Sequence, residues 1–365
     1  MKVIIAAAGT GGHINPGIAI ANKIEQENKG SDIRFIATGK KLEEDLISKA
    51  GYKSYKIDAY GFSKSLKISN IKRMIKTFKG FKQAKKILEE FKPDIVIGTG
   101  GYICGAVITS AKKLGIPTVL HESNAYPGLA IRLLQKNVNT ILVGIEEAKK
   151  HLKKAKNVVY TGTPTKTVPI ELTKTKINKI YKEHKLSTKL PVVLVFGGSQ
   201  GAKRINDTMI NLLNEKLNED YQIIWATGQE QYDGIVKKLN KKIKNVSVVP
   251  YIYNMAEVMS ISSLVVARSG AMTLTELALF GKPSIFVPLP SSSSNRQEDN
   301  ARVFESYGAA NIILNNELNE TNLNENINSI LSNKLLLERM GRSAKKLAIY
   351  NVEDRIYNEI KKLVR

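Results

Sequence analysis

The sequence predicts an α/β protein with two doubly wound, parallel-sheet domains that face a cleft. Apolar, β-branched runs recur along the chain, each followed by a glycine-rich turn and an amphipathic run, which is typical of βαβ units. The first and third runs lie about 190 residues apart, and each resembles the opening strand of a Rossmann-type half. The four runs are VIIAAAGTGGH (3–13), DIVIGTGGYICG (94–105), VVLVFGGSQGA (192–202) and LVVARSGAMTLTE (264–276).

The chain length fits this organisation, because 365 residues suit two domains of about 150 to 200 residues each. A boundary is expected near YTGTPTKTVP (160–169), which contains two prolines and precedes a Lys-rich segment. We therefore predict an N-terminal domain over 1–163 and a C-terminal domain over 164–344. The pattern from about Leu335 to the end predicts a basic helix, whose last part, about 345–365, is expected to pack back on the N-terminal domain.

The charge balance points to anionic partners. The formal net charge is +23, and residues 1–163 carry 28 Lys and Arg against 13 Asp and Glu. Aromatic content is 7%, and no aromatic–basic interleaving or recognised motif favours nucleic acid as the partner. The single cysteine, Cys104, excludes an intrachain disulfide. No apolar run reaches the length of about 20 residues that a membrane-spanning helix needs, so membrane contact is expected to be peripheral.

Several phosphate-binding chemistries fail on spacing. The loop at 9–14 lacks the last glycine of a dinucleotide fingerprint, and no P-loop motif occurs. The four histidines and one cysteine show no metal-ligand spacing, so neither a metal nor a cofactor is expected. The stretch GGSQG (197–201) matches a serine nucleophile elbow, but Gln200-Gly201-Ala202-Lys203 is more typical of a helix N-terminus, and no suitable His/Asp pair follows.

Diphosphate binding without a metal remains. Backbone N–H groups at a helix start attract anions, and the Ser199 hydroxyl of GGSQGA can donate to a phosphate. Glu276 lies six residues after Gly270, early in a predicted helix, where its carboxylate can accept two hydrogen bonds from a ribose diol. The alternatives are a glycine turn used for geometry alone and a helix-terminal acid that only stabilises the dipole. Gln297, after the serine loop, is a candidate sugar contact or a solvated loop residue.

Six motifs in order resemble the MurG family of N-acetylglucosaminyltransferases, over nearly the whole chain. They are AGTGGHINPG, GTGGY, HESNAYPGLA, GGSQGA, RSGAMTLTEL and NRQEDNA. The resemblance implies the two-domain GT-B architecture and a metal-independent, inverting transfer. The donor would be UDP-N-acetylglucosamine, and the acceptor the C4 hydroxyl of undecaprenyl-diphosphate-linked muramyl-pentapeptide (lipid I). The product would be lipid II, for peptidoglycan synthesis.

The resemblance also implies a donor site in the C-terminal half and sugar contacts from the N-terminal half. At position 166 this chain has lysine where the family often has arginine. Lysine cannot form the paired hydrogen bonds of a guanidinium group, so the sequence leaves undecided whether Lys166 contacts the donor. Residues 121–124 read HESN, where the family has HEQN, so Ser123 replaces a glutamine next to Asn124. The implied donor contacts are Thr10, Gly11, Gly12, Asn124, Lys166, Ser199, Ile252, Ala271, Met272, Thr273, Leu274, Glu276 and Gln297.

His13 is the candidate general base. An inverting transfer needs the acceptor hydroxyl to lose a proton, and a positioned base contributes about 10²- to 10⁴-fold. His13 is expected at the tip of a glycine loop on the acceptor half. Glu122 is the competing base. A histidine that only hydrogen-bonds its own loop is the alternative for His13, and the residues alone do not decide between these roles.

The segment 64–88 is expected to meet the membrane. It holds nine Lys and Arg and no acid, with apolar residues at helical spacing, as in basic amphipathic helices on anionic membrane surfaces. The alternative is an ordinary helix with its apolar face in the core. The expected location is the cytoplasmic face of the cell membrane, bound peripherally. The expected membrane contacts are Lys72, Arg73, Ile75, Lys76, Phe78 and Lys79.

Two other functions remain as alternatives. Another GT-B enzyme that uses UDP-N-acetylglucosamine, an epimerase or a diacylglycerol glycosyltransferase, would share the fold and the donor. A basic nucleic-acid-binding protein would explain the charge but leaves HESNAYPG and Glu276 without a role.

Overall fold

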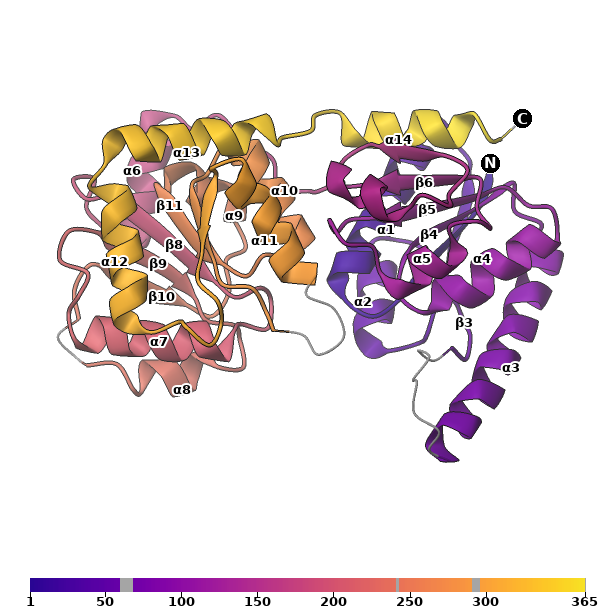
Figure 1. The fold of residues 1–365 in the computed structure, drawn as a ribbon, viewed down its shortest axis with the longest axis horizontal. Coiled ribbons are helices and arrows are strands. Elements are labelled where there is room, and N and C mark those ends of the chain that lie inside the picture. Colours follow the sequence, from indigo (N-terminus) through magenta and orange to yellow (C-terminus); the bar gives the residue numbers. More distant parts are fainter. Residues whose placement is uncertain (60–67, 241–242, 291–295, 365) are drawn as a thin grey trace. The chain divides into compact units, whose positions relative to one another are not determined.

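The protein consists of two compact α/β units, seen in the computed structural model of Figure 1. The structure describes residues 1–59, 68–240, 243–290 and 296–364, with the backbone alone for residues 68–78. Unit 1 comprises Met1–Lys166 together with Tyr350–Arg365, and unit 2 comprises Thr167–Ile349. The chain therefore passes between the units twice.

Unit 1 is built on a parallel sheet with the strand order β3-β2-β1-β4-β5-β6-β7. Its central strands read as nearly continuous apolar runs because both faces of a parallel sheet are covered. In register, Val3 of β1 lies opposite Ile33 of β2 and Ile95 of β4. The strands are β1 (Lys2–Ala7), β2 (Asp32–Ala37), β3 (Lys53–Lys56), β4 (Ile95–Gly100), β5 (Thr118–Glu122), β6 (Thr140–Val143) and β7 (Val158–Tyr160).

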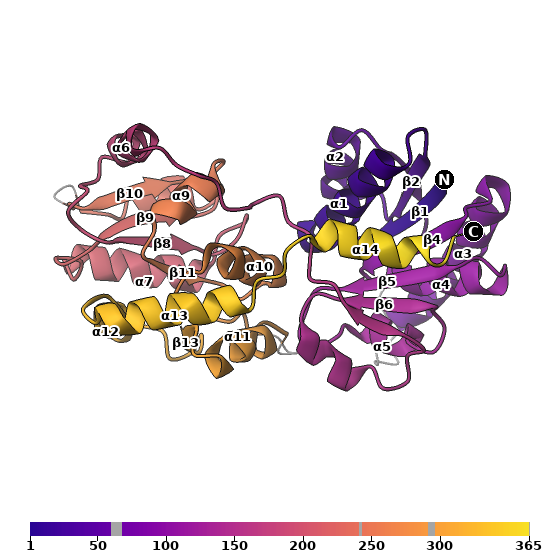
Figure 2. The ribbon, with the colours of Figure 1, turned by 90° about the horizontal axis from the view of Figure 1, so that it is seen from above.

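Helices cover both faces of this sheet. Figure 2 shows α1 and α2 on one side and α4 and α5 on the other; α3 packs against α4, and α14 packs against α1. The helices are α1 (Gly11–Glu27), α2 (Lys41–Lys49), α3 (Ile68–Phe91), α4 (Ile103–Lys113), α5 (Leu129–Leu134), the 3₁₀ helix Glu146–His151, and α14 (Val352–Lys361).

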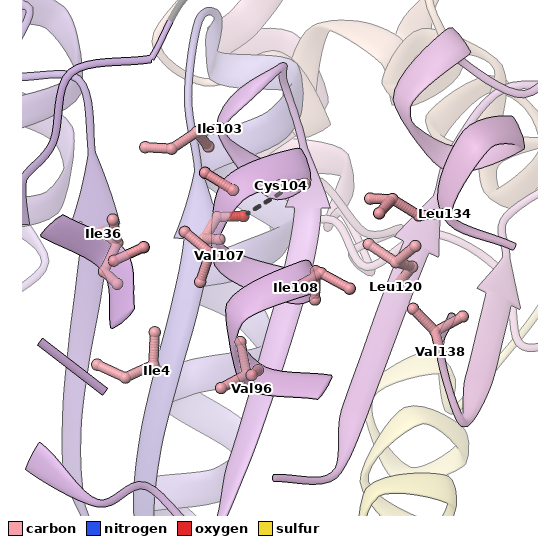
Figure 3. Packing of buried hydrophobic residues seen from close by; sticks show 14 of the residues in the cluster. Ile4, Ile36, Val96, Ile103, Cys104, Val107, Ile108, Leu120, Leu134 and Val138 are labelled. Atoms are coloured by element: carbon pink, nitrogen blue, oxygen red, sulfur yellow. Dashed lines mark hydrogen bonds between the residues drawn. The ribbon is translucent and has the colours of Figure 1, made fainter. Parts of the chain in front are cut away.

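The core of unit 1 between the sheet and α4 is built mainly from aliphatic side chains. Figure 3 shows Ile4, Val96 and Leu120 from the strands facing Val107 and Ile108 from the helix. All five side chains are buried. Burying an aliphatic side chain of this size contributes about 1.5–3 kcal/mol, so this layer holds the strand ends in place beneath the loops that follow them.

Cys104 lies in the same layer. Its thiol donates to the carbonyl of Ala6 at 3.5 Å, and burial raises its pKa to about 12. A protonated, fully buried thiol of this kind packs as a small apolar side chain.

Unit 2 repeats the architecture with the strand order β10-β9-β8-β11-β12-β13, all parallel. Trp225, the single tryptophan of the chain, is fully buried in β9. The strands are β8 (Val192–Phe196), β9 (Gln222–Ala226), β10 (Val246–Val249), β11 (Leu264–Ala267), β12 (Ser284–Phe286) and β13 (Ala310–Ile312).

A capping side chain marks the start of α6, α12 and α13 in unit 2. Thr173 caps α6, Asn319 caps α12 and Asn333 caps α13, each accepting a hydrogen bond from the backbone N–H three residues on. Gly281, with φ +61°, ends α10 in the left-handed conformation. The helices are α6 (Lys174–Glu183), α7 (Lys203–Asn214), α8 (Tyr232–Val236), α9 (Met255–Ile261), α10 (Ala271–Phe280), α11 (Arg296–Ser306), α12 (Glu320–Leu331) and α13 (Lys334–Lys346).

The single basic helix predicted from about Leu335 to the end is wrong. The structure has two helices, α13 and α14, because the chain leaves the helical conformation after Lys346 and Asn351 adopts the left-handed region with φ +55°. The first of these helices belongs to unit 2 and the second to unit 1. On α1, Lys23 forms an ion pair with Asp354 at 2.6 Å, and Asn28 donates to the Tyr357 hydroxyl at 2.7 Å.

The α/β class with two parallel sheets is confirmed, and each of the four glycine-rich turns joins a strand to a helix. Within the part of the chain that the structure describes, every helix is too short or too polar to cross a bilayer.

Candidate functional site

Each sheet has a point where the strand order reverses, and the glycine loops lie beside it. In unit 1 the reversal falls between β1 and β4, and in unit 2 between β8 and β11. Ligands of open α/β sheets bind at this point, outside the carboxyl ends of the strands. The loops there are 8–10 and 101–102 in unit 1, and 197–202 and 268–270 in unit 2.

His13 lies in the first turn of α1, directly after the loop that follows β1. Its Nδ1 lies 2.9 Å from the carbonyl oxygen of Ala8. Because a carbonyl oxygen only accepts hydrogen bonds, Nδ1 carries the proton and Nε2 of the neutral ring is the unprotonated nitrogen. Gly9, with φ +104°, makes the turn that folds the loop back onto the helix.

The neighbouring strand fixes the position of the His13 ring. A Cβ atom on Gly100 would lie 2.3 Å from His13 Cδ2, so the ring packs directly on the backbone at the end of β4. The Thr99 hydroxyl donates to the His13 carbonyl at 2.7 Å. Only glycine at position 100, where φ is +131°, leaves room for this arrangement.

Glu122, at the end of β5, shapes the loop 123–128. One carboxylate oxygen accepts from the backbone N–H and the side-chain amide of Asn124, both at 2.9 Å. The other accepts from the backbone N–H of Gly128 at 2.7 Å. Glu122 is 6% exposed. Both oxygens are therefore committed to holding the loop that presents Asn124.

His121 is buried behind this loop. Burial lowers its pKa, so the ring is neutral at physiological pH. Its Nε2 lies 3.1 Å from the carbonyl of Gly162, and its Nδ1 lies 3.5 Å from the Ser123 hydroxyl. The Gly162 contact makes Nε2 the protonated nitrogen, which leaves Nδ1 as acceptor for Ser123. Ser123 thus faces His121.

In unit 2 the loop GGSQGA joins β8 to the start of α7 at Lys203. Gly198 and Gly201 have φ of +91° and +74°, and Ser199 is exposed between them. A Cβ on Gly201 would lie 2.0 Å from the carbonyl oxygen of Thr227, so this loop packs closely on the loop after β9. An exposed hydroxyl before a helix N-terminus is suited to an anionic group.

A second group of hydrogen bonds joins the loop after β11 to the start of α11. The Ser269 hydroxyl donates to the Gln297 carbonyl at 2.6 Å, and the buried Asn300 donates to the Ser269 carbonyl at 3.1 Å. Arg268 Nη1 donates to the carbonyls of Val287 and Pro288 at 2.8 and 2.9 Å. Burial lowers the pKa of Arg268 to about 10. These bonds bring Gln297 next to the N-terminus of α10.

The remaining predicted donor residues lie at the same edge of this sheet. Ala271–Leu274 form the first turn of α10, and Glu276, half-buried, lies in the next. The Gln297 side-chain oxygen accepts from the backbone N–H of Leu289 at 2.9 Å. Ile252 is buried in the loop after β10, between two exposed tyrosines whose ring centroids are 5.0 Å apart.

Comparison with known proteins identifies the family of this chain. Residues 3–143 match the glycosyltransferase family 28 N-terminal domain, and residues 192–356 match the C-terminal domain of that family. The chain is 39% identical, over 100% of its length and 99% of the relative's, to the "UDP-N-acetylglucosamine--N-acetylmuramyl-(pentapeptide) pyrophosphoryl-undecaprenol N-acetylglucosamine transferase" of Acetivibrio thermocellus. The protein of the same name from Ruminiclostridium cellulolyticum is 41% identical, with both chains fully covered. This chain belongs to the MurG family.

The structural comparison agrees. The crystal structure of MurG from Acinetobacter baumannii superposes with a TM-score of 0.80 at 29% identity, covering 99% of both chains. These comparisons confirm the resemblance to the MurG family that six short motifs indicated. They also confirm the expected GT-B architecture.

Each MurG-family site residue predicted from the sequence and described here falls at a carboxyl edge or, for Lys166, at the end of unit 1. Lys166 is exposed. No group of three His, Cys, Asp or Glu side chains suited to a metal occurs among the described residues. The roles of these residues toward substrate stay predictions. Unit 1 carries Thr10, Gly11, Gly12, His13, Glu122 and Asn124, and unit 2 carries Ser199, Ile252, Ala271, Met272, Thr273, Leu274, Glu276 and Gln297.

Of the predicted membrane contacts, the structure describes the side chain of Lys79 alone. Lys79 is exposed and lies 3.0 Å from the Asp58 carboxylate, which compensates part of its charge. The side chains of Lys72, Arg73, Ile75, Lys76 and Phe78 lie outside the described residues, although the backbone of α3 there is helical.

Sequence reasoning missed three groups that hold these loops: Glu43, Asn206 and Arg268. Arg268 opens the RSGAMTLTEL motif but was given no role, and Glu43 and Asn206 lie outside the six motifs. Glu43 could have been found by asking which group accepts from the backbone N–H groups of the tight glycine loop, because such buried donors need an acceptor.

Proposed function

We propose that this protein transfers N-acetylglucosamine from UDP-N-acetylglucosamine to the C4 hydroxyl of the muramoyl sugar of lipid I, with inversion at the anomeric carbon. The product is lipid II, an intermediate of peptidoglycan synthesis. The observation that carries the proposal is the full-length relationship to transferases named for this donor and acceptor. The reaction makes the protein a hexosyltransferase of cell-wall biogenesis.

Unit 2 is proposed to bind the donor. The exposed Ser199 and the N-terminus of α10 supply hydrogen-bond donors of the kind that a diphosphate needs. Glu276 would accept from the ribose hydroxyls, the backbone at Ile252 would read uracil, and Gln297 would contact the sugar. The bonds of Ser269 and Asn300 support this assignment, because they fix α11 next to α10.

Unit 1 is proposed to bind the acceptor and carry the base. The C4 hydroxyl gives its proton to Nε2 of His13 while its oxygen bonds to the anomeric carbon. The bond from that carbon to the diphosphate oxygen breaks, and UDP leaves with the electron pair. The geometry supports His13 over Glu122, because Nε2 is the unprotonated nitrogen whereas both oxygens of Glu122 already hold the loop. Thr10, Gly11, Gly12 and Asn124 would face the sugar of the donor, and Lys166 would add a further donor contact.

The donor role of Glu276 is tested by UDP release from UDP-N-acetylglucosamine with and without a lipid I analogue. Loss of a charged hydrogen bond costs about 1.5–3 kcal/mol, so Glu276→Ala should raise KM for the donor about 10- to 100-fold. The matched control is Glu325→Ala, because Glu325 is exposed on α12 of the same unit. Release without acceptor would indicate an epimerase or hydrolase, and an unchanged KM would remove Glu276 from the ribose site.

The peripheral membrane location is part of the proposal. A net charge of +23, with the larger excess in residues 1–163, supports attraction to the anionic cytoplasmic leaflet that carries the acceptor. Segment 64–88 is the proposed contact, and the domain roles follow: residues 1–163 face acceptor and membrane, and residues 164–344 bind the donor.

Changing Lys72, Arg73, Lys76 and Lys79 to Gln should abolish sedimentation of the protein with anionic vesicles at low salt. Each basic residue near such a surface contributes about 1 kcal/mol, and salt screens the attraction. The control changes Lys189, Lys237, Lys238 and Lys244, all exposed in unit 2, to Gln. Equal loss in both variants would mean that net charge, and not this helix, binds the vesicles.

A further inference from the structure

A buried carboxylate stands behind the loop that carries His13. Glu43, in the first turn of α2, is fully buried. Its Oε1 accepts from the backbone N–H of Gly9 at 2.8 Å. We infer that Glu43 is a positioning residue for His13 and acts through the peptide bond between Ala8 and Gly9. This inference deepens the proposed function, because it concerns the imidazole proposed as the base.

One peptide group links the two side chains. The carbonyl of Ala8 accepts from His13 Nδ1, and the N–H of Gly9 donates to Glu43. These atoms belong to the same planar amide, and in a trans peptide its C=O and N–H point in opposite directions. Carboxylate, amide and imidazole therefore form a continuous chain of hydrogen bonds, with the charge at one end and Nε2 at the other.

The charge acts on the ring through polarisation of the amide. A carboxylate that accepts from an N–H makes the carbonyl oxygen of the same peptide a stronger acceptor, since linked hydrogen bonds strengthen one another. That oxygen then holds the proton more firmly on Nδ1 and leaves the lone pair on Nε2. A carboxylate bound directly to a histidine fixes the tautomer of hydrolytic triads, and here one peptide group lies between them.

Glu43 is itself held so that its carboxylate stays in place. Its Oε2 accepts from the backbone N–H and the hydroxyl of Thr38, at 2.8 and 2.7 Å. The N–H groups of Gly9 and Thr38 and the Thr38 hydroxyl, which follow β1 and β2, thus satisfy a carboxylate that is fully buried from solvent. A buried charge is retained at considerable cost, and one already bonded to the His13 loop supplies the orienting partner that a general base requires.

The ring has little other freedom. Gly100 packs against it, and the Thr99 hydroxyl holds its main-chain carbonyl. Loss of the Glu43 charge would therefore change the distribution of the proton between the two ring nitrogens more than the place of the ring. This distinguishes the inference from a purely structural role, in which Glu43 would affect folding but not the tautomer.

The experiment measures the ¹⁵N chemical shifts of the imidazoles in histidine-labelled protein, at a pH where the rings are neutral, with His13 assigned from His13→Ala. Wild type should show His13 protonated on Nδ1. Glu43→Gln should show a larger share of the Nε2-protonated tautomer than wild type and a kcat lowered by about tenfold or more, with KM for both substrates close to wild type. Its Tm should fall, because the Gln nitrogen cannot accept from the buried N–H of Gly9 or of Thr38. Glu44→Gln, exposed on the same turn of α2, should match wild type in every readout.

A wild-type tautomer and wild-type kcat in Glu43→Gln would overturn the inference. If that variant does not accumulate, Glu43→Asp gives the same decision, because it withdraws the carboxylate from Gly9 by one methylene. A displaced Gly9 amide signal with an unchanged His13 tautomer and kcat would then overturn it. A shifted tautomer with full activity in His13→Ala would instead keep the positioning role and remove His13 as the base.

Discussion

Replacing His13 by alanine is expected to lower kcat by about 10²- to 10⁴-fold, the range that a positioned general base contributes. KM for both substrates should change little, because an interaction made only in the transition state lowers kcat and kcat/KM together. The structural reason is the hydrogen bond from Nδ1 to Ala8, which leaves Nε2 to take the acceptor proton. Steady-state release of UDP with a lipid I analogue measures the effect.

The control for this prediction is His151→Ala. His151 is exposed in the same unit, and its ring contacts the ring of Tyr126. Glu122→Gln is the informative companion, because it breaks the bonds that hold the loop 123–128 and should lower Tm as well as activity. A kcat within about tenfold of wild type in His13→Ala, with a far lower kcat in Glu122→Gln, would contradict the assignment and favour Glu122.

Replacing Asn206 by leucine is expected to destabilise unit 2 by about 3 kcal/mol or more, the largest effect on stability that we predict. Asn206, almost fully buried, accepts from the Trp225 indole at 3.0 Å and donates to the Thr227 carbonyl at 2.8 Å. It also donates to the Gln231 side chain at 2.9 Å. Leucine would leave the buried indole N–H and the Thr227 carbonyl without partners, and each such group costs about 1–3 kcal/mol.

Trp225 makes this effect easy to measure. It is the only tryptophan, so its emission during urea unfolding follows unit 2 alone. Asn211→Leu is the matched control, because Asn211 is exposed on the same helix and makes a single long hydrogen bond of 3.4 Å. Equal urea midpoints for the two leucine variants would refute the prediction. Because Thr227 packs against Gly201, Asn206→Leu should also raise KM for the donor.

The parts of the fold that follow from local pattern were predictable. The four apolar runs with glycine turns became β1, β4, β8 and β11, each followed by a helix, because a parallel strand buried on both faces needs a continuous apolar run. The break between α13 and α14 could not be predicted in this way. Asn351 adopts the left-handed conformation before α14, but an asparagine in the sequence does not by itself indicate a helix break.

The support of the site could not be predicted because it depends on contacts distant in sequence. Glu43 lies in KKLEEDL, where three consecutive acids are typical of a solvated helix face. Only the fold brings the first of them to Gly9, 34 residues earlier. Asn206 likewise reaches Trp225 through the packing of α7 on β9. The glycine motifs mark the loops at the carboxyl edges of the sheets, whereas Glu43 and Asn206, which hold two of these loops, lie outside the six motifs.

The double passage of the chain between the units has a consequence for biosynthesis. The ribosome begins unit 1 before unit 2, but unit 1 takes its helix α14 from residues that follow unit 2 in the chain. Until α14 is translated, the surface of α1 around Lys23 and Asn28 lacks Asp354 and Tyr357. Unit 2 lies in the chain between the two segments of unit 1, so all of its strands and helices are translated before α14. Unit 1, which is begun before unit 2, is thus completed after it, and a ribosome that stalls before α14 is translated would carry a finished unit 2 together with a unit 1 whose α1 surface is uncovered.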